Sequence, residues 1–464
     1  MKKLIIAFAL LQSLVASAGP TVKRVVARQM WPWSTSIRIE YTLEGAEAPV
    51  DIQLAFKDGE TPLSNAAGYA ALDGDILYVG NGVHVITLDP IQAFGKGAGA
   101  IADFKVCVTP VATELPDNKV LYKIIDLDGA TKGKITDVTR VDLLMGKWGA
   151  IETDYSKIGP NFSTTLTDVL IWTGVTQNEA YKTTKLVVRR IPAGTFMMGS
   201  PEGETDRNAS PITGAPKAGE TQHQVTLRKD YWMGVFPVTQ KQYKLITGSD
   251  SVPTSQHGDI SSGNADLNPV YDLKYYDVRG SDKGSKWPSS HEVDESSVLG
   301  QLRNLIDKDD IDLPTEAQWE RACRGGNEGA NILFSGKPLY VDGQAQSANR
   351  NEAVWCYYNS KKEGGAASET VTQEVGIKVP NAFGLYDMVG NVCEWVLDRA
   401  ADFTADPETD PVGALSGNPI VRGGDVTVNC GLTGAMRSAF RFARNPSALY
   451  AGVIPGFRVS WTEE

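Results

Sequence analysis

The chain has 464 residues, 22% of them charged and 42% hydrophobic, and a formal net charge of −11 at pH 7. This composition is that of a globular protein, and the length predicts two domains of ordinary size. The acidic balance argues against nucleic acid or an anionic membrane surface as a partner, because both would repel the protein. A protein or carbohydrate ligand is the partner class that remains.

Residues 1–18 have the pattern of a secretory signal peptide, with Lys2 and Lys3 before an apolar run and a small-residue cleavage site at Ala16–Ala18. The apolar run, Leu4 to Val15, is shorter than the roughly 20 residues that cross a bilayer. We therefore expect an exported protein, periplasmic or extracellular, that begins near Gly19 and has no membrane span.

Residues 19–125 predict a β-sandwich of the immunoglobulin or fibronectin kind. Short segments with alternating polarity, such as Ile37–Leu43, are separated by Gly, Pro and Asp. Within them, Trp31–Trp33 is an aromatic cluster that either fills the end of the core or stacks against a glycan. The expected strands are Val22–Arg28, Ile37–Leu43, Val50–Phe56, His84–Leu88, Phe104–Val108 and Val120–Ile125.

Residues 126–183 show little periodicity and are interpreted as a connecting segment. The second domain, residues 184–464, opens with a hairpin pattern at Thr184–Gly199. Two capping boxes follow, at Thr239–Gln242 and Thr315–Gln318, and each predicts the start of a helix. On the second helix Trp319 and Cys323 lie one turn apart, which predicts a buried, inert thiol.

Metal centres built on histidine or cysteine are not indicated. The four histidines are never three or four residues apart, and the five cysteines form no C-x-x-C pair. Few cysteines also argue against a disulfide scaffold, and their odd number leaves at least one thiol unpaired within the chain.

The second domain carries eight motifs in a fixed order: Ala193–Gly199, Phe236–Gln240, Leu313–Arg321, Gly384–Asp387, Gly390–Trp395, Arg422–Gly424, Arg437–Arg441 and Gly456–Arg458. Together they resemble the formylglycine-generating enzyme, or sulfatase-modifying factor, family over residues 186–460. The resemblance implies an α+β domain, related to C-type lectins and poor in regular secondary structure, which the sandwich precedes.

The resemblance also implies a structural calcium ion. The family's ligand positions correspond to Asp387, Gly390, Val392 and Glu394. Two carboxylates and two backbone carbonyls are the hard oxygen donors that calcium prefers. The alternative is that both carboxylates cap backbone N–H groups without a metal.

Catalysis in the family uses two cysteines, five residues apart, that bind copper(I) as thiolates and oxidise a sulfatase cysteine. Alignment places them at Val428 and Thr433, neither of which can hold copper. Other expected pocket residues also differ: the chain has Asp425, Cys393 and Ile454 where the family has Ser, Trp and Asn. Among these pocket positions, Arg441 alone keeps the family's identity.

One alternative keeps chemistry in this pocket. Cys430 lies two residues from an expected cysteine, so that Cys393 and Cys430 could form a disulfide or an unconventional metal pair. The competing interpretation is two unrelated buried thiols.

The leading hypothesis is an exported, divergent family member without copper that binds a ligand or a protein segment. The alternatives are an active oxidase that converts a sulfatase cysteine to formylglycine, and a cell-surface adhesion component. The long insert at residues 249–311, rich in Ser, Asp and Gly, is either the source of ligand specificity or a solvated loop.

Overall fold

A computed structural model of the chain divides into two compact units. The first comprises residues 1–118 with 141–147, and the second comprises residues 119–140 with 148–464. The structure describes residues 19–30, 34–65, 71–95, 101–112, 118–152, 170–204, 207, 219–253, 259–325, 332–333, 337–338, 340–341, 344–345, 351–364, 369–427, 435–449 and 452–463. The expected signal peptide, Trp31–Trp33, Val428, Cys430 and Thr433 lie outside these residues.

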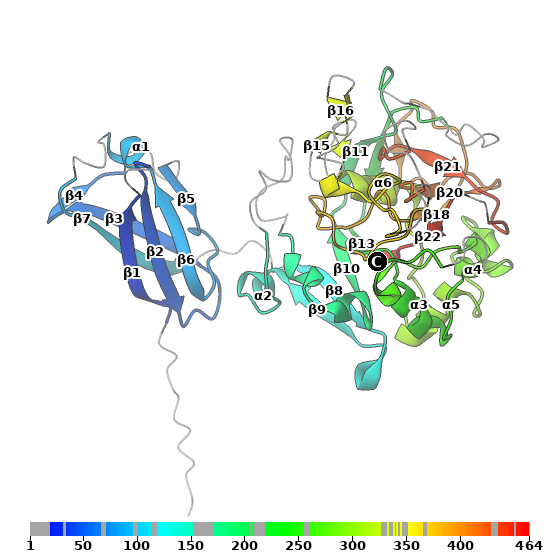
Figure 1. Ribbon diagram of the computed structural model, residues 1–464, viewed down its shortest axis with the longest axis horizontal. Helices are drawn as coiled ribbons and strands as arrows, with labels where there is room; N and C mark the ends of the chain where they lie inside the picture. The colour runs from blue at the N-terminus through cyan, green and yellow to red at the C-terminus, as the bar shows by residue number, and fades with distance from the viewer. Residues whose placement is uncertain are drawn as a thin grey trace, which may run out of the picture. The chain divides into compact units, whose positions relative to one another are not determined.

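The first unit consists of two antiparallel sheets, as the alternating pattern predicts (Figure 1). Inward-facing residues such as Ile39, Tyr41 and Ile86 are fully buried and form its core. One sheet has the order β1 (Thr21–Gln29), β2 (Ile37–Glu44), β6 (Gly82–Leu88) and β5 (Leu72–Gly74), and the other β4 (Thr61–Leu63), β3 (Val50–Asp58) and β7 (Phe104–Ala112). The helix α1 (Pro90–Phe94) follows β6.

One predicted strand belongs elsewhere. Val120–Ile125 was expected in the sandwich, but β8 (Val120–Asp126) pairs with β10 (Lys185–Ile191) in the second unit. β8 carries apolar residues on both faces, a pattern that favours a central strand covered on both sides. A sandwich strand has one face exposed to solvent. The sheet order is β23 (Ser460–Thr462), β13 (Tyr231–Gly234), β10, β8 and β9 (Ile135–Thr139).

Two smaller sheets complete the second unit. One has the order β21 (Arg441–Ala443), β20 (Pro419–Arg422), β18 (Cys393–Arg399) and β22 (Pro455–Gly456), and the other β11 (Gly194–Met198), β12 (His223–Leu227) and β19 (Glu408–Thr409). Two short hairpins pair β14 (Ile332–Leu333) with β15 (Lys337–Pro338) and β16 (Tyr340–Val341) with β17 (Gln344–Ala345). The domain is therefore the α+β unit that the resemblance implies.

Both predicted capping boxes are confirmed. Thr239 begins α3 (Gln240–Thr247), and Thr315 begins α6 (Glu316–Arg324). Each helix ends at a glycine with positive φ, Gly248 or Gly325, as is usual for helix C-caps. The remaining helices are α2 (Arg140–Leu144), α4 (Tyr275–Arg279), α5 (Val298–Ile306), and the 3₁₀ turns η3 (Gly129–Thr131), η6 (Thr173–Thr176), η7 (Glu179–Lys182), η8 (Ala265–Leu267) and η9 (Lys283–Lys286).

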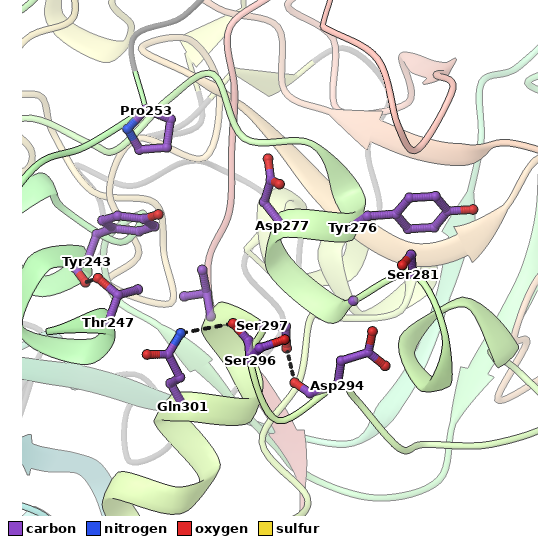
Figure 2. Close-up of a pocket in the computed structure, with 12 residues that line it drawn as sticks. Tyr243, Thr247, Pro253, Tyr276, Asp277, Ser281, Asp294, Ser296, Ser297 and Gln301 are labelled. Carbon is purple, nitrogen blue, oxygen red and sulfur yellow. Dashed lines mark hydrogen bonds between the residues drawn. The ribbon is translucent and has the colours of Figure 1, made fainter. Parts of the chain in front are cut away.

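The insert at residues 249–311 is not a solvated loop where the structure describes it. It contains α4 and α5, and its side chains Val278, Leu299 and Leu302 are fully buried in the main core of the second unit. Together with α3, these helices line a cleft of about 510 Å³ at the surface (Figure 2). The cleft is therefore formed by helices that are packed into the core.

The described helices include none that is both long and apolar enough to cross a membrane.

Candidate functional site

The expected pocket centres on a contact between Cys393 and Asp425. Cys393 begins β18, and Asp425 follows β20 after Gly423 and Gly424. Both glycines have positive φ, and an added Cβ at Gly423 would lie 2.7 Å from the Met388 carbonyl oxygen, so only glycine fits this turn. The turn brings the Asp425 carboxylate beside the Cys393 thiol, near enough for its negative charge to act on that thiol.

This contact keeps the thiol protonated. Burial raises the pKa of Cys393 well above its ordinary value, and the negative charge of Asp425 raises it further. Asp425 also accepts hydrogen bonds from Thr427 N at 2.9 Å and Ile454 N at 3.1 Å. Burial nevertheless raises the pKa of Asp425.

The surroundings of this pair are apolar. Ile454 is fully buried and packs with Tyr271, Val392 and Val426. Ile454 stands where the resemblance expects Asn. Its side chain offers apolar contact area and cannot form a hydrogen bond, so Ile454 donates only through its backbone N–H, to Asp425. A buried, dry environment of this kind favours neutral groups.

Among the described residues, the Arg441 guanidinium contacts groups other than Cys393 and Asp425. Its guanidinium forms a two-point ion pair with Glu316 of α6, with Nε 2.7 Å from Oε1, and it also donates to Ala401 O. The ring of Phe403 lies 3.7 Å below it. Arg441 is therefore buried and held by Glu316, Ala401 and Phe403, which indicates a structural role.

The predicted Cys393–Cys430 disulfide is contradicted, because Cys393 is a free thiol. Cys356 is the described cysteine that is disulfide-bonded, while Cys107 and Cys323 are free. Cys323 is buried on α6, and burial raises the pKa of its thiol to about 12, as expected for an inert core residue.

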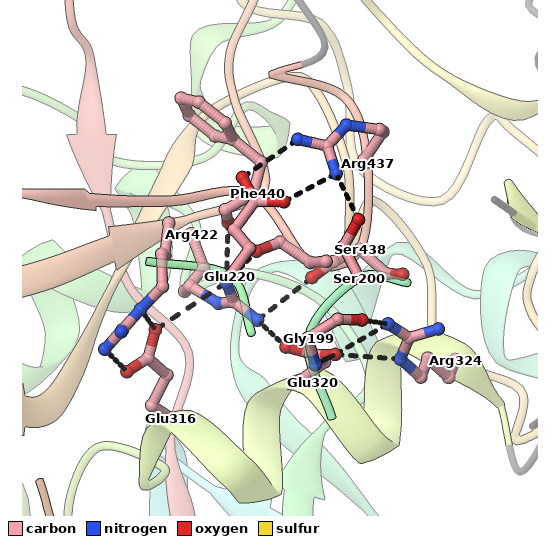
Figure 3. A network of polar contacts seen from close by, with 12 residues as sticks. Gly199, Ser200, Glu220, Glu316, Glu320, Arg324, Arg422, Arg437, Ser438 and Phe440 are labelled. Atoms are coloured by element: carbon pink, nitrogen blue, oxygen red, sulfur yellow. Dashed lines mark hydrogen bonds and ion pairs between the residues drawn. The ribbon is translucent and has the colours of Figure 1, made fainter. Parts of the chain in front are cut away.

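The charged residues of the shared motifs form a buried network around α6 (Figure 3). Glu320 accepts from Gly199 N at 2.9 Å, Arg324 Nε at 2.9 Å and the Arg422 guanidinium. Arg437 makes a two-point pair with Glu220, at 2.7 and 2.9 Å. The Glu320 contacts fasten α6 to β20 and to Gly199 after β11, and the Arg437–Glu220 pair joins the segment before β21 to the segment before β12. The motifs in which these charges occur therefore maintain the fold.

The segment from Asp387 to Glu394 has an unusual backbone. Asp387, Gly390 and Asn391 all have positive φ, and an added Cβ at Gly390 would lie 2.2 Å from the Trp355 carbonyl oxygen. Asn391 bonds both the N–H and the carbonyl of Gln373. The turn is thus imposed by close packing against neighbouring chain segments.

The two carboxylates of this segment differ in their partners. Glu394 is fully buried and accepts from Arg458 at two points, both 2.7 Å, and from Trp319 Nε1 at 2.7 Å. Asp387 is also buried, but its carboxylate accepts a single hydrogen bond, from Gly376 N at 2.7 Å. Burial raises the pKa of Asp387 to about 6, and the charge of Glu394 adds to this effect.

These observations fit a cation site only in part. Asp387 is a buried carboxylate that forms no ion pair with another described residue, although the charges of Arg458 and Lys182 act on it. A calcium ion would satisfy a group of this kind. Glu394 already has a counter-charge in Arg458. Among the described residues, no three or more His, Cys, Asp or Glu side chains come together, so a cation here would depend on backbone oxygens.

Comparisons with known proteins show which family the second unit resembles. A family model described as the sulfatase-modifying factor enzyme 1-like domain matches residues 174–463. The formylglycine-generating enzyme of Streptomyces coelicolor is 27% identical over 293 residues, which are 58% of this chain and 87% of that protein. The mouse enzyme is 39% identical over 114 residues, 24% of this chain and 29% of its own length.

A chaperone protein LppX from Paenibacillus barcinonensis is 26% identical over 204 residues, covering 39% of this chain and 65% of that protein. This chain therefore spans less than two thirds of that protein and of the mouse enzyme. Solved structures that resemble it include Treponema denticola variable protein 1, with a TM-score of 0.43 and 20% identity over 60% of this chain and 96% of that chain. PvdO from Pseudomonas aeruginosa has a TM-score of 0.42 and 23% identity, over 60% and 94%.

Proposed function

Because the chain belongs to the sulfatase-modifying factor enzyme 1-like family, we propose that it is a divergent, exported member that binds a ligand or a protein segment and has lost the copper oxidase chemistry. The observation that carries the proposal is the burial of the Cys393 thiol beside the Asp425 carboxylate.

Copper(I) chemistry requires soft thiolate donors, and a thiol binds a metal only after it loses its proton. The pKa of Cys393 is raised by burial and by a neighbouring carboxylate, so ionising this thiol would place two negative charges side by side. Val428 and Thr433, at the positions where the resemblance expects the family's cysteines, supply no thiol either. This combination supports a binding role over an oxidase role.

We also propose that Asp387 holds a structural calcium ion with the backbone carbonyls of Gly390 and Val392, and with Glu394 at the edge of the site. The support is the Asp387 carboxylate, whose pKa is raised to about 6 by burial. A bound calcium would supply that charge and brace the irregular turn, with no part in chemistry.

The function is tested by a copper(I) titration of the reduced protein against a competing chelator. A peptide with a sulfatase cysteine motif is then incubated with the protein under oxygen and analysed by mass spectrometry. Both assays use a Cys107→Ser background, because Cys107 is exposed and would bind copper on its own account. We expect no stoichiometric copper and an unchanged peptide.

The proposal fails if one equivalent of copper binds tightly and the peptide loses its thiol. In that case the Cys393→Ser variant would show whether Cys393 is a ligand, since it would lose both effects.

A further inference from the structure

The cleft beside α3, α4 and α5 has a lining that the pocket around Cys393 does not share (Figure 2). Helix α3 contributes Tyr243, α4 contributes Tyr276 and Asp277, and α5 contributes Gln301. The close-up shows Tyr243 on one side of the cleft and Tyr276 and Asp277 on the other. The volume of about 510 Å³ lies within the range of roughly 300–1,000 Å³ that is typical of small-molecule pockets.

The walls of the cleft are held in place by bonds behind them. Asp294 accepts backbone N–H groups from Asp282 at 3.1 Å and Lys283 at 2.6 Å. The Ser297 side chain caps α5 by accepting from Gly300 N at 3.1 Å. Gly280, with positive φ, lies against the Asp294 side chain, where an added Cβ would clash. A cleft with fixed walls binds a ligand at a low entropic cost.

Several polar groups in the cleft remain free for a ligand. Within the described residues, neither the Tyr243 hydroxyl nor the Tyr276 hydroxyl makes a hydrogen bond. Asp277 is exposed, and its carboxylate uses Oδ2 alone, to accept Lys274 N at 2.8 Å. Gln301 donates Nε2 to Ser296 O at 3.0 Å, and its carbonyl oxygen stays available. The cleft therefore offers acceptors, hydroxyl groups and two aromatic rings.

The lining also excludes other ligand classes. The described residues that line the cleft include no Lys, Arg or His, so a phosphate or sulfate group would meet the charges of Asp277 and Asp294 without a cation. Serines, a threonine and a glutamine make up much of the remaining surface, which is too polar for a lipid tail or an apolar helix.

We propose that this cleft binds a neutral saccharide. The saccharide would pack one sugar ring against Tyr243 and another against Tyr276, at opposite ends of the cleft, and its hydroxyl groups would donate to Asp277 and exchange hydrogen bonds with Gln301. Hydroxyl-to-carboxylate bonds are stronger than bonds between neutral groups, which assigns Asp277 the largest polar contribution. The inference rests on the proposed role as a binding module and places the ligand away from Cys393.

The test is an array of neutral oligosaccharides, followed by calorimetry of the full chain with the best-bound sugar. Asp277→Asn should weaken binding about tenfold or more, because a charged acceptor is lost. Tyr276→Ala should weaken it by about tenfold as well, and Tyr276→Phe should retain most of the affinity, since the ring remains. Tyr358→Ala is the matched control, since Tyr358 is 44% exposed and lies outside the cleft.

The inference is overturned if no neutral sugar on the array binds, or if the Asp277 and Tyr276 variants bind as well as the wild type. Binding of a lysine-rich peptide at this cleft, abolished by salt, would also overturn it in favour of a cationic partner. Failure of the proposed function would look different: copper binding and peptide oxidation would appear whether or not sugar binds.

Discussion

The thiol of Cys393, at the start of β18, lies beside the carboxylate of Asp425, which follows the neighbouring strand β20. The resemblance to formylglycine-generating enzymes expects Trp and Ser at these positions. The exchange replaces a large ring and a hydroxyl with a thiol and a carboxylate that are both hidden from solvent. Burial and the neighbouring carboxylate favour the protonated thiol, so Cys393 is expected to be unreactive.

The first prediction concerns thiol reactivity. In the native protein, iodoacetamide should modify Cys107 and spare Cys323 and Cys393, because the latter two are 3% exposed and burial raises the pKa of both thiols. Peptide mapping by mass spectrometry gives the extent at each site. The denatured protein is the control, in which all three should react. Modification of native Cys393 at the rate of Cys107 would contradict the burial argument.

The second prediction concerns the ion pair between Arg458 and Glu394. Arg458→Ala should lower the free energy of unfolding by about 3–5 kcal/mol, because it leaves Glu394 buried without a counter-charge. Arg228→Ala is the matched control: Arg228 pairs with Asp410 at the surface, and its loss should cost less than about 1 kcal/mol. Urea unfolding of both variants measures the difference. Equal costs would show that the buried pair is not what holds this turn.

The third prediction concerns pH. Burial, and after it the charge of Glu316, raises the pKa of Asp398 to about 8, so the folded state holds a proton that the unfolded chain releases near pH 4. The stability that this proton contributes is fully present below the unfolded pKa and is lost as the pH rises through about 8.

Asp398→Asn removes this titration while it keeps an oxygen that can accept Glu316 N. As the pH rises from 5 to 9, the wild type should therefore lose unfolding free energy relative to the variant. The shift should exceed about 1 kcal/mol, since one pKa unit corresponds to roughly 1.4 kcal/mol. A constant difference across this range would argue against a raised pKa.

The fourth prediction concerns calcium. Saturating calcium should raise the thermal midpoint of the wild type, because an ion at about 100 times its dissociation constant stabilises the folded state by about 2.7 kcal/mol. Asp387→Asn should lose this response, and Asp406→Asn, at an exposed aspartate, should keep it. No shift in the wild type up to about 10 mM calcium, beyond the range of weak extracellular sites, would count against the ion.

The fifth prediction compares two glycines with positive φ. Gly248→Ala meets open space, so its cost is confined to backbone strain of about 1 kcal/mol. Gly390→Ala would in addition press a methyl group to 2.2 Å from the Trp355 carbonyl oxygen, and we expect it to cost at least about 2 kcal/mol more. Chemical denaturation of the two variants gives the comparison, and similar costs would mean that the turn can relax.

The sequence predicted the elements that have a strong local signal. Alternating polarity predicts the strand at Ile37–Leu43, and the capping box predicts the start of α6. Each of these signals is contained within a few consecutive residues. The insert was harder to interpret, because α4 is a five-residue helix that is buried in a core shared with distant residues such as Leu302, more than twenty positions further along the chain. The position of β8 was missed for the same reason: pairing with β10 joins residues about sixty positions apart.

The candidate site was predictable in part. Motif order identified Asp387, Cys393 and Asp425, but the sequence alone does not show which carboxylate pairs with which basic side chain. Arg441 was placed in the pocket by its motif, whereas in the structure it pairs with Glu316. Tyr243, Tyr276 and Asp277 belong to none of the eight motifs. A cleft between three short helices also gives no periodic pattern in the sequence from which it could be predicted. The pair Tyr276–Asp277 in a polar insert was the available signal.

The position of β8 matters for anyone who isolates the second unit. The family model begins at residue 174, but β10 is hydrogen-bonded on one side to β8, which ends at Asp126. A recombinant fragment cut at the family boundary would leave Lys185–Arg189 with a bare edge of backbone donors and acceptors, in a segment rich in valine and leucine. Such a fragment is expected to aggregate by strand addition, and one that begins at Lys119 is expected to stay monodisperse.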